Sequence, residues 1–478
     1  MQQEDLMGNS KDQNSMIKIV MFPWLAYGHI SPFIELAKSL ITSNKNFHIY
    51  LCSTPVNLNS IKSTNHSLFQ PNYADSIEFI ELNLPDLPPH YQTTNGLPPN
   101  LMPKLKKSFQ KAMPNFYQIL QRITPHLLIY DFLQEWAPMA AARLNIPAVL
   151  FFSTGAATTC FFNYLRTGEN LDSFPFKAIY IRDDIEHSKI DKIMKPNNNT
   201  DPSQPVDLCI KRSCDIILIR SSRALESKYI DYLSVLCEKT IVPVGPLIHP
   251  TDQIQKKIKQ EEGEEETIMN WLEGKPKSST VFASFGSEYF LSEDEIEEIA
   301  YGLELSGVNF IWAVRFPRSE AVVCLEEKLP KGFLERNRDK GMVVNGWVPQ
   351  RRILGHQNIG GFMSHCGWGS VMEGLSYGVP IIAAPMHLDQ PMNSRLVEEM
   401  GVGFEVKRDG ESGRFERGEI GRVVREVVSG ERGEVMRRRV REVVTEMRSR
   451  EEEDMNGVVG ELIKVCCRNR GRGRGGGG

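Results

Sequence analysis

Residues 362–374 read FMSHCGWGSVMEG, in which His365, Trp368, Ser370 and Glu373 are interleaved with glycines. Glycine lets a backbone turn sharply and approach a ligand closely, and Ser370 is typical of the start of a helix, here continuing through Glu373. The free N–H groups and the positive dipole end of such a helix favour an anion, typically phosphate. An ordinary strand-to-helix turn explains the same residues. This stretch alone therefore leaves two interpretations open.

The composition favours a globular protein with small-molecule chemistry. A chain of 478 residues is long for one domain, and its net charge of -4 lacks the basic balance of a nucleic-acid binder. The polar residues 1–16 lack the apolar core of a signal peptide, and no apolar stretch of about 18 residues follows. Nine cysteines without a CxxC pair argue against a disulfide framework and a structural zinc site. We expect a cytoplasmic monomer that does not bind nucleic acid or insert into a membrane.

Short apolar runs alternate with helical stretches twice along the chain. The first set includes 17–22, 48–51, 127–130 and 148–151, with a helix expected to start near Pro32; the second includes 279–284, 309–314 and 342–344. This alternation predicts an α/β protein with two doubly wound, Rossmann-like domains facing a cleft. The expected order is a disordered tail (1–16), a first domain (17–250), a charged linker (251–266), a second domain (267–465) and a disordered basic, glycine-rich tail (466–478).

Two loops follow the first strands of the two halves. They read PWLAYGHISP (23–32) and SFGSEYF (284–290). Neither contains the GxGxxG fingerprint of a dinucleotide site, and the chain has no GxSxG nucleophile elbow. The patterns therefore disfavour a nicotinamide-dependent enzyme and a serine hydrolase.

Residues 347–390, from WVPQ to HLDQ around the opening stretch, closely resemble the 44-residue signature of plant UDP-dependent glycosyltransferases. The resemblance extends over most of the chain, through the GHISP and SFGS loops. It implies the two-domain GT-B fold of family 1. It also implies an inverting transfer of a sugar from a UDP-sugar donor, UDP-glucose by the tendency of the last residue, to a small-molecule acceptor without a metal cofactor.

The resemblance assigns the nucleotide half of the donor site to four residues. Trp347 resembles the indole that stacks on uracil, for which a broad aromatic face is suited. Val348 and Gln350 match positions near the base and ribose, and Glu373 is similar to the carboxylate that accepts both ribose hydroxyls.

The diphosphate and sugar contacts follow in the same way. His365 and Ser370 resemble diphosphate contacts at a helix start, and the resemblance implies that Ser287 contacts the phosphates from the other side. Positions that hydrogen-bond the sugar are matched by Trp368, Asp389 and Gln390. Gly369 departs from the family, which usually has Asn there, and this places donor affinity in question. Ala384 stands where many members have Trp.

A general base is needed because an alcohol is too weak an acid to attack an anomeric carbon unaided. His29, in the loop after the first strand, resembles the catalytic histidine of the family, and Asp131 resembles the partner that orients the imidazole and stabilises its charged form. A structural histidine and an Asp131 that caps the following helix are the alternatives. His356 and His387 are interpreted as structural, and Cys366 beside His365 lacks further ligands for a metal.

The acceptor is assigned by resemblance alone. The loops FPWLAYGHISPF, TTNGLPP and PMHLDQP are similar to the plant subgroup that extends the sugar of flavonoid, lignan or terpenoid glycosides by a 1→6 or 1→2 link. Transfer to an aglycone hydroxyl is the nearest alternative. A catalytically silent UDP-sugar-binding protein is a second, and an epimerase or hydrolase of the same architecture is more remote.

Overall fold

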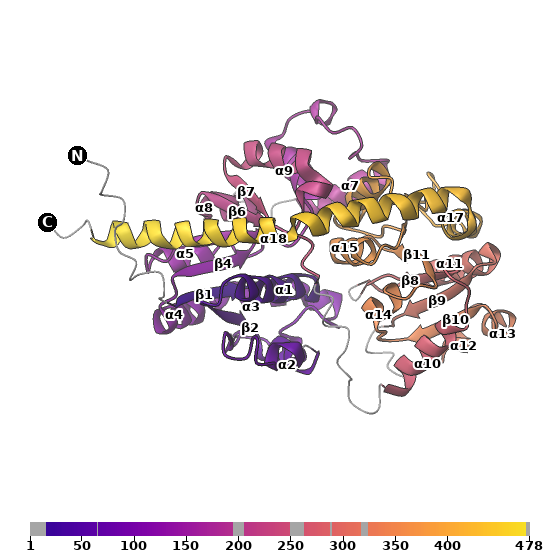
Figure 1. Cartoon of the computed structure of the whole chain (residues 1–478), viewed down its shortest axis with the longest axis horizontal. Helices are drawn as coiled ribbons and strands as arrows, with labels where there is room; N and C mark the ends of the chain where they lie inside the picture. Colours follow the sequence, from indigo (N-terminus) through magenta and orange to yellow (C-terminus); the bar gives the residue numbers. More distant parts are fainter. Residues whose placement is uncertain are drawn as a thin grey trace. The chain divides into compact units, whose positions relative to one another are not determined.

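The computed structural model of the chain describes residues 16–64, 66–194, 205–248, 262–286, 289–316 and 324–474. Two β-sheets with helices between their strands account for the architecture (Figure 1). This confirms the predicted α/β fold class.

The first sheet has seven strands in the order β3-β2-β1-β4-β5-β6-β7. Its strands are β1 (Ile17–Phe22), β2 (Phe47–Ser53), β3 (Ile77–Glu81), β4 (Leu127–Asp131), β5 (Ala148–Phe152), β6 (Ile216–Ile219) and β7 (Thr240–Pro243). Strands β3, β2, β1, β4 and β5 pair in parallel. The chain order reverses direction between β1 and β4, and such switch points are where doubly wound sheets bind ligands.

The second sheet has six strands in the order β10-β9-β8-β11-β12-β13, all parallel. Its strands are β8 (Thr280–Ser284), β9 (Asn309–Val314), β10 (Gly341–Asn345), β11 (Ile359–Ser364), β12 (Ile381–Ala383) and β13 (Gly403–Glu405). The switch point lies between β8 and β11, where Ser284 pairs with Ser364. The loops after these two strands are SFGS and HCGWG, so the topology brings both to one edge of the sheet.

Helices connect the strands. In the first part of the chain they are α1 (Tyr27–Ser43), α2 (Pro55–Thr64), α3 (Met102–Lys111), α4 (Met113–Ile123), α5 (Ala137–Ala142), α6 (Ala156–Thr167), α7 (Asp184–Met194), α8 (Pro205–Arg212) and α9 (Arg223–Cys237). In the second part they are α10 (Glu262–Glu273), α11 (Glu293–Ser306), α12 (Leu325–Lys328), α13 (Phe333–Arg336), α14 (Gln350–Leu354), α15 (Trp368–Ser376), α16 (Gln390–Glu399), α17 (Arg417–Ser429) and α18 (Glu431–Arg474). Short 3₁₀ helices span His66–Phe69, Pro89–Tyr91, Pro99–Leu101 and Leu171–Ser173.

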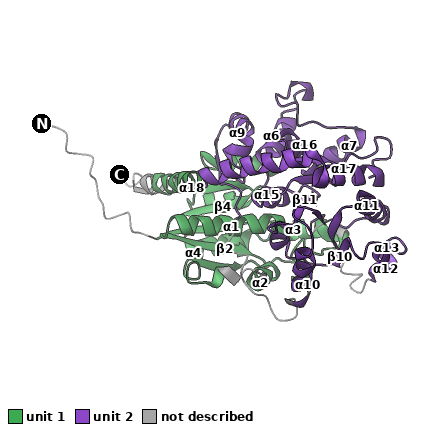
Figure 2. Cartoon of the chain, turned by 45° about the vertical axis from the view of Figure 1, so that its right-hand side comes forward, with its two compact units in different colours: residues 1–153, 203–218, 453–478 green, residues 154–202, 219–452 purple. Residues whose placement is uncertain are grey.

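The chain divides into two compact units (Figure 2). Unit 1 contains residues 1–153, 203–218 and 453–478, and unit 2 contains residues 154–202 and 219–452. Unit 2 therefore includes α6, α9 and β7 together with the second sheet. The predicted domain limits at 250 and 266 stay a prediction, because residues 249–261 lie outside the described part and residues 262–266 belong to α10.

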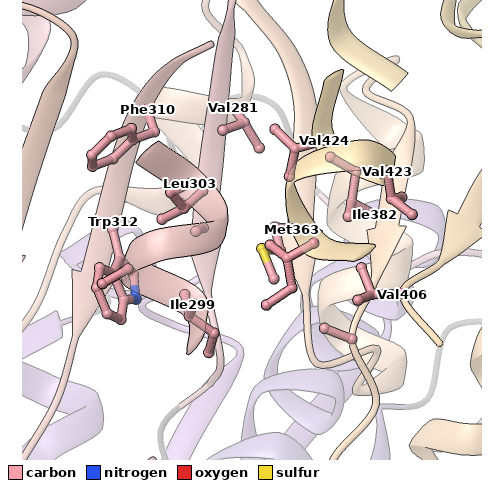
Figure 3. Close-up of a cluster of buried hydrophobic side chains, with 14 of the residues drawn as sticks. Val281, Ile299, Leu303, Phe310, Trp312, Met363, Ile382, Val406, Val423 and Val424 are labelled. Atoms are coloured by element: carbon pink, nitrogen blue, oxygen red, sulfur yellow. The ribbon is translucent and has the colours of Figure 1, made fainter. Parts of the chain in front are cut away.

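The core of unit 2 shows why its strands are apolar throughout. Figure 3 shows Phe310 and Trp312 of β9 facing side chains of α11, and Met363 of β11 in the same cluster. Its neighbour Phe362 points to the other face, where it stacks on Phe282 with ring centroids 5.3 Å apart. Successive strand residues point to opposite faces, so a parallel sheet covered by helices on both sides needs apolar residues at every position.

Three expected boundaries differ from the structure. Helix α1 begins at Tyr27 rather than near Pro32, and α15 begins at Trp368 rather than Ser370. Neither has a side-chain hydrogen bond at its N-cap, Ala26 or Gly367, so the usual sequence signal of a helix start is missing. Helix α18 continues to Arg474, so the tail expected to be disordered is helical over 466–474. Residues 1–15 and 475–478 of the expected tails lie outside the described residues.

Candidate active site

The switch point of the first sheet carries the two predicted catalytic residues. His29 lies in the first turn of α1 and not in a loop, and Asp131 is the last residue of β4. Because β1 and β4 are neighbours, with Phe22 paired to Tyr130, the two side chains meet: His29 Nδ1 lies 2.8 Å from Asp131 Oδ2. The Asp131 carboxylate is fully buried and the imidazole is 20% exposed. With Nδ1 donating to the carboxylate, neutral His29 has its acceptor lone pair on Nε2.

The surroundings of Asp131 exclude the helix-cap interpretation. Helix α5 begins at Ala137 with Trp136 as its N-cap, several residues beyond Asp131. Asp131 Oδ1 instead accepts the N–H of Leu133 at 3.1 Å, which fixes the carboxylate toward His29. The buried carboxylate is thus positioned to orient the imidazole of His29.

Two neighbours of His29 were not found from the sequence. Ser153, directly after β5, places its Oγ 3.4 Å from His29 Nδ1, and the Phe132 ring lies 5.3 Å from the imidazole between centroids. Phe132 in turn lies 5.6 Å from Phe152. Phe132 directly follows β4, and Ser153 directly follows β5. Their positions at the carboxyl ends of two expected strands are the sequence signal that could have identified them.

The switch point of the second sheet holds His365 between two glycines. A Cβ at Gly286, whose φ is +82°, would lie 2.7 Å from His365 Nε2, and a Cβ at Gly367 would lie 2.6 Å from the same atom. Any side chain at either position would displace the imidazole. Burial, and then the nearby His387, lower the pKa of His365 to about 4. His365 is therefore neutral at pH 7, and its Nδ1 has no hydrogen-bond partner among the described residues.

The start of α15 presents backbone donors beside His365. The N–H groups of Ser370 and Val371 bond to the carbonyl oxygen of Gly367, so the amides of Trp368 and Gly369 precede the first intrahelical bond. Gly369 has no positive φ and fits the regular first turn. The geometry is that of a helix terminus able to bind an anion.

The indole of Trp368 has a structural role. It is 3% exposed, and its Nε1 donates to the carbonyl oxygen of Arg220 at 2.6 Å. A Cβ at Gly155 would lie 3.0 Å from the ring, so the indole packs against that glycine. The indole N–H is thus already used inside the protein, and the sugar contact predicted for Trp368 stays a prediction.

The residues predicted to bind base and ribose lie together. Trp347 is 51% exposed, whereas Val348 is buried. Glu373 accepts Nε2 of Gln350 at 2.7 Å and Nε of Arg351 at 3.0 Å. Glu373, which is predicted to bind the ribose, is thus oriented by Gln350, another predicted residue, and by Arg351, which the sequence did not single out.

The other two residues predicted to bind the sugar, Asp389 and Gln390, are held by internal bonds. Gln390 Oε1 accepts the N–H groups of Met386 and His387 at 2.9 and 3.0 Å, so the buried amide shapes its own loop. Asp389 Oδ2 accepts Nδ2 of Asn393 at 2.8 Å, and the same Nδ2 bonds the carbonyl oxygen of Cys366 at 2.9 Å. Asn393, which the sequence did not reveal, therefore links Asp389 to the loop of Cys366.

Three remaining predictions concern residues or groups outside this geometry. Ser287 lies outside the described residues. Within the described ranges, no three His, Cys, Asp or Glu side chains are grouped to hold a metal ion. No helix among the residues that the structure covers is long and apolar enough to span a membrane.

Family models match both halves of the chain. The two doubly wound sheets match the fold of solved plant glycosyltransferases of the GT-B class. Residues 253–432 match the family model described as UDP-glucoronosyl and UDP-glucosyl transferase, and residues 15–249 match the glycosyltransferase N-terminal domain. The chain belongs to the UDP-glycosyltransferase family of plants, and a UDP-sugar is its co-substrate.

Similar proteins span nearly the whole chain. A mogroside IIIx synthase of Siraitia grosvenorii is 47% identical, covering 95% of this chain and 94% of its own. A cyanidin-3-O-glucoside 2-O-glucuronosyltransferase of Bellis perennis is 45% identical (96% and 100%), and a beta-D-glucosyl crocetin beta-1,6-glucosyltransferase of Gardenia jasminoides is 44% identical (93% and 98%). Medicago truncatula UGT71G1, solved with UDP-glucose, shares the fold with a TM-score of 0.76 at 24% identity, over 95% of this chain and 99% of its own.

Proposed function

We propose that this UDP-glycosyltransferase transfers glucose from UDP-glucose to a hydroxyl on the sugar of a small plant glycoside, with inversion, forming a 1→6 or 1→2 branch. The observation that carries the chemistry is the buried pair of Asp131 with His29 at 2.8 Å. Two relatives named above for transfer to a glucoside, at 45% and 44% identity, support the class of acceptor.

His29 acts as the general base. As the acceptor oxygen attacks C1 of the donor sugar, its proton passes to Nε2, and Asp131 stabilises the imidazolium that forms. The bond between C1 and the β-phosphate oxygen breaks on the opposite face, so the anomeric configuration inverts and UDP leaves. Phe132 beside the imidazole supplies an aromatic surface for an apolar acceptor body.

The donor is held by the second sheet. The exposed Trp347 stacks on uracil, and Glu373, oriented by Gln350 and Arg351, accepts the ribose hydroxyls. The amides at the start of α15 and neutral His365 donate to the diphosphate, and with Ser287 and Ser370 they stabilise the charge on the departing UDP. Asp389 and Gln390 contact the glucose.

The test compares one aglycone with its monoglucoside, each incubated with UDP-glucose, with UDP release and product formation both measured. We expect at least about 10-fold higher kcat/KM for the monoglucoside, and the same rate with EDTA as with added Mg²⁺. Equal or better use of the aglycone favours the alternative, direct glucosylation of an aglycone hydroxyl. UDP binding without transfer to either member of any pair would support the silent binding protein and contradict the proposal.

A further inference from the structure

The position of Gly369 faces a buried arginine. A Cβ added at Gly369 would lie 3.4 Å from Nη1 of Arg220, the nearest heavy atom in that direction. Arg220 directly follows β6 and is 5% exposed. The guanidinium therefore lies against the space that a side chain at position 369 would enter, at the first turn of α15.

Arg220 is fixed by hydrogen bonds at its side chain and at its backbone. Its Nε donates to the carbonyl oxygen of Pro246 at 3.0 Å, and its own carbonyl oxygen accepts the Trp368 indole at 2.6 Å. The second bond links its backbone to the first residue of α15 itself. A guanidinium fixed in this way loses little further entropy when it binds an anion.

The charge of the donor gives such a group a role. UDP leaves with its negative charge on the diphosphate, and the residues predicted to contact it are Ser287, His365, Gly369 and Ser370. None of these side chains is cationic at neutral pH, since burial lowers the pKa of His365 to about 4. Backbone dipoles alone supply only a fraction of a charge at a helix start.

We propose that Arg220 binds the donor diphosphate and replaces the carboxamide that Gly369 lacks. This proposal rests on the proposed placement of the diphosphate at the start of α15. The guanidinium presents N–H donors and a full positive charge, so it compensates for more than one lost neutral hydrogen bond. It also accounts for a glycine at position 369, because a smaller residue there leaves the guanidinium room to reach the phosphates.

Affinities of UDP and of uridine separate this role from a structural one. Replacing arginine by glutamine (Arg220→Gln) should weaken UDP binding by about 10-fold or more, measured by calorimetry, with the affinity for uridine, measured by competition, changed less than about twofold. The UDP affinity of the wild type should also fall more steeply with salt than that of the variant. Arg437→Gln is the control, since it removes a guanidinium bond to the Val427 carbonyl in α17 and should leave both affinities unchanged.

A double substitution keeps the test decisive. Adding Gly369→Asn to Arg220→Gln should restore part of the lost UDP affinity, whereas Gly369→Asn alone should change it less than about threefold, because Arg220 already serves this position. Equal loss of uridine and UDP affinity, or unchanged UDP affinity in Arg220→Gln, would overturn the role of Arg220. A wild type that does not bind UDP would overturn the donor site as a whole.

Discussion

At the scale of single residues, substitutions of His29 and Asp131 should slow the chemical step without changing the binding of UDP. Removing the imidazole (His29→Ala) should lower kcat by about 10²-fold or more, because no other group takes the acceptor proton, while the dissociation constant of UDP stays unchanged. Asp131→Ala should lower kcat less, since the imidazole remains. Steady-state kinetics and calorimetry with UDP measure the two effects.

A second histidine beside a carboxylate provides the control for that pair. On α7, His187 Nδ1 lies 3.8 Å from Asp191 Oδ2, and both side chains are exposed. His187→Ala should therefore leave kcat unchanged. Full activity in Asp131→Ala, or a parallel loss of UDP affinity in His29→Ala, would contradict the assigned roles.

The lowered pKa of His365 predicts how the stability of the protein changes with pH. Its pKa is lowered to about 4 in the folded protein from an ordinary value of 6.5, so between these values the unfolded chain binds a proton that the native protein does not. Stability linked to this group is thus complete above pH 6.5 and is lost as the pH falls toward 4. Free energies of unfolding measured from pH 7 to 4 should fall less steeply in His365→Gln than in the wild type; parallel slopes would contradict this.

At the scale of the elements, Gly286 of the SFGS loop leaves room for the imidazole of His365, which lies in the loop after β11. Gly286→Ala places a Cβ 2.7 Å from His365 Nε2 at a φ of +82°, so we expect His365 to shift and UDP affinity to fall by about 10-fold. Gly307→Ala is the matched control, because φ there is +66° and no atom lies within 4 Å of the new Cβ. Both variants carry backbone strain, but only Gly286→Ala should change the affinity measured by calorimetry.

The sequence predicted the elements better than their ends. Apolar runs located the strands, because a parallel sheet buried on both faces needs them, and the expected strand at 309–314 coincides with β9. The starts of α1 and α15 were missed, since their N-caps Ala26 and Gly367 offer no side-chain acceptor. Local pattern identifies a helix start only where a capping side chain exists.

The candidate site was predictable to the extent that its residues belong to a contiguous signature. The signature named Gln350, Glu373 and Asp389 as donor contacts. It did not reveal Ser153 beside His29, Asn393 between Asp389 and Cys366, or Arg220 beside Gly369. Ser153 and His29, like Arg220 and Gly369, are far apart in the sequence, and Asn393 reaches Cys366 in the loop after another strand, so only the folded chain brings these residues together.

At the scale of the whole molecule, the two compact units hold different parts of the proposed reaction. His29, Asp131 and Ser153 belong to unit 1. The described residues predicted to bind the donor, and Arg220, belong to unit 2. Donor binding is thus assigned to unit 2 and proton transfer to unit 1. We therefore expect UDP to affect unit 2 and the acceptor to affect unit 1.

Hydrogen exchange with UDP alone tests this division. UDP without acceptor should slow amide exchange most in peptides that cover α14 and the start of α15, because the nucleotide bonds to backbone and side chains there and stabilises the bound form by mass action. Peptides that cover β4 and the loop after it should change little, since the proposed acceptor site is empty. The Gly286→Ala variant should lose the protection at equal UDP concentration, and His29→Ala should retain it. Protection centred on residues 17–43 instead would place the nucleotide on unit 1 and contradict the assignment of the donor site to the second sheet.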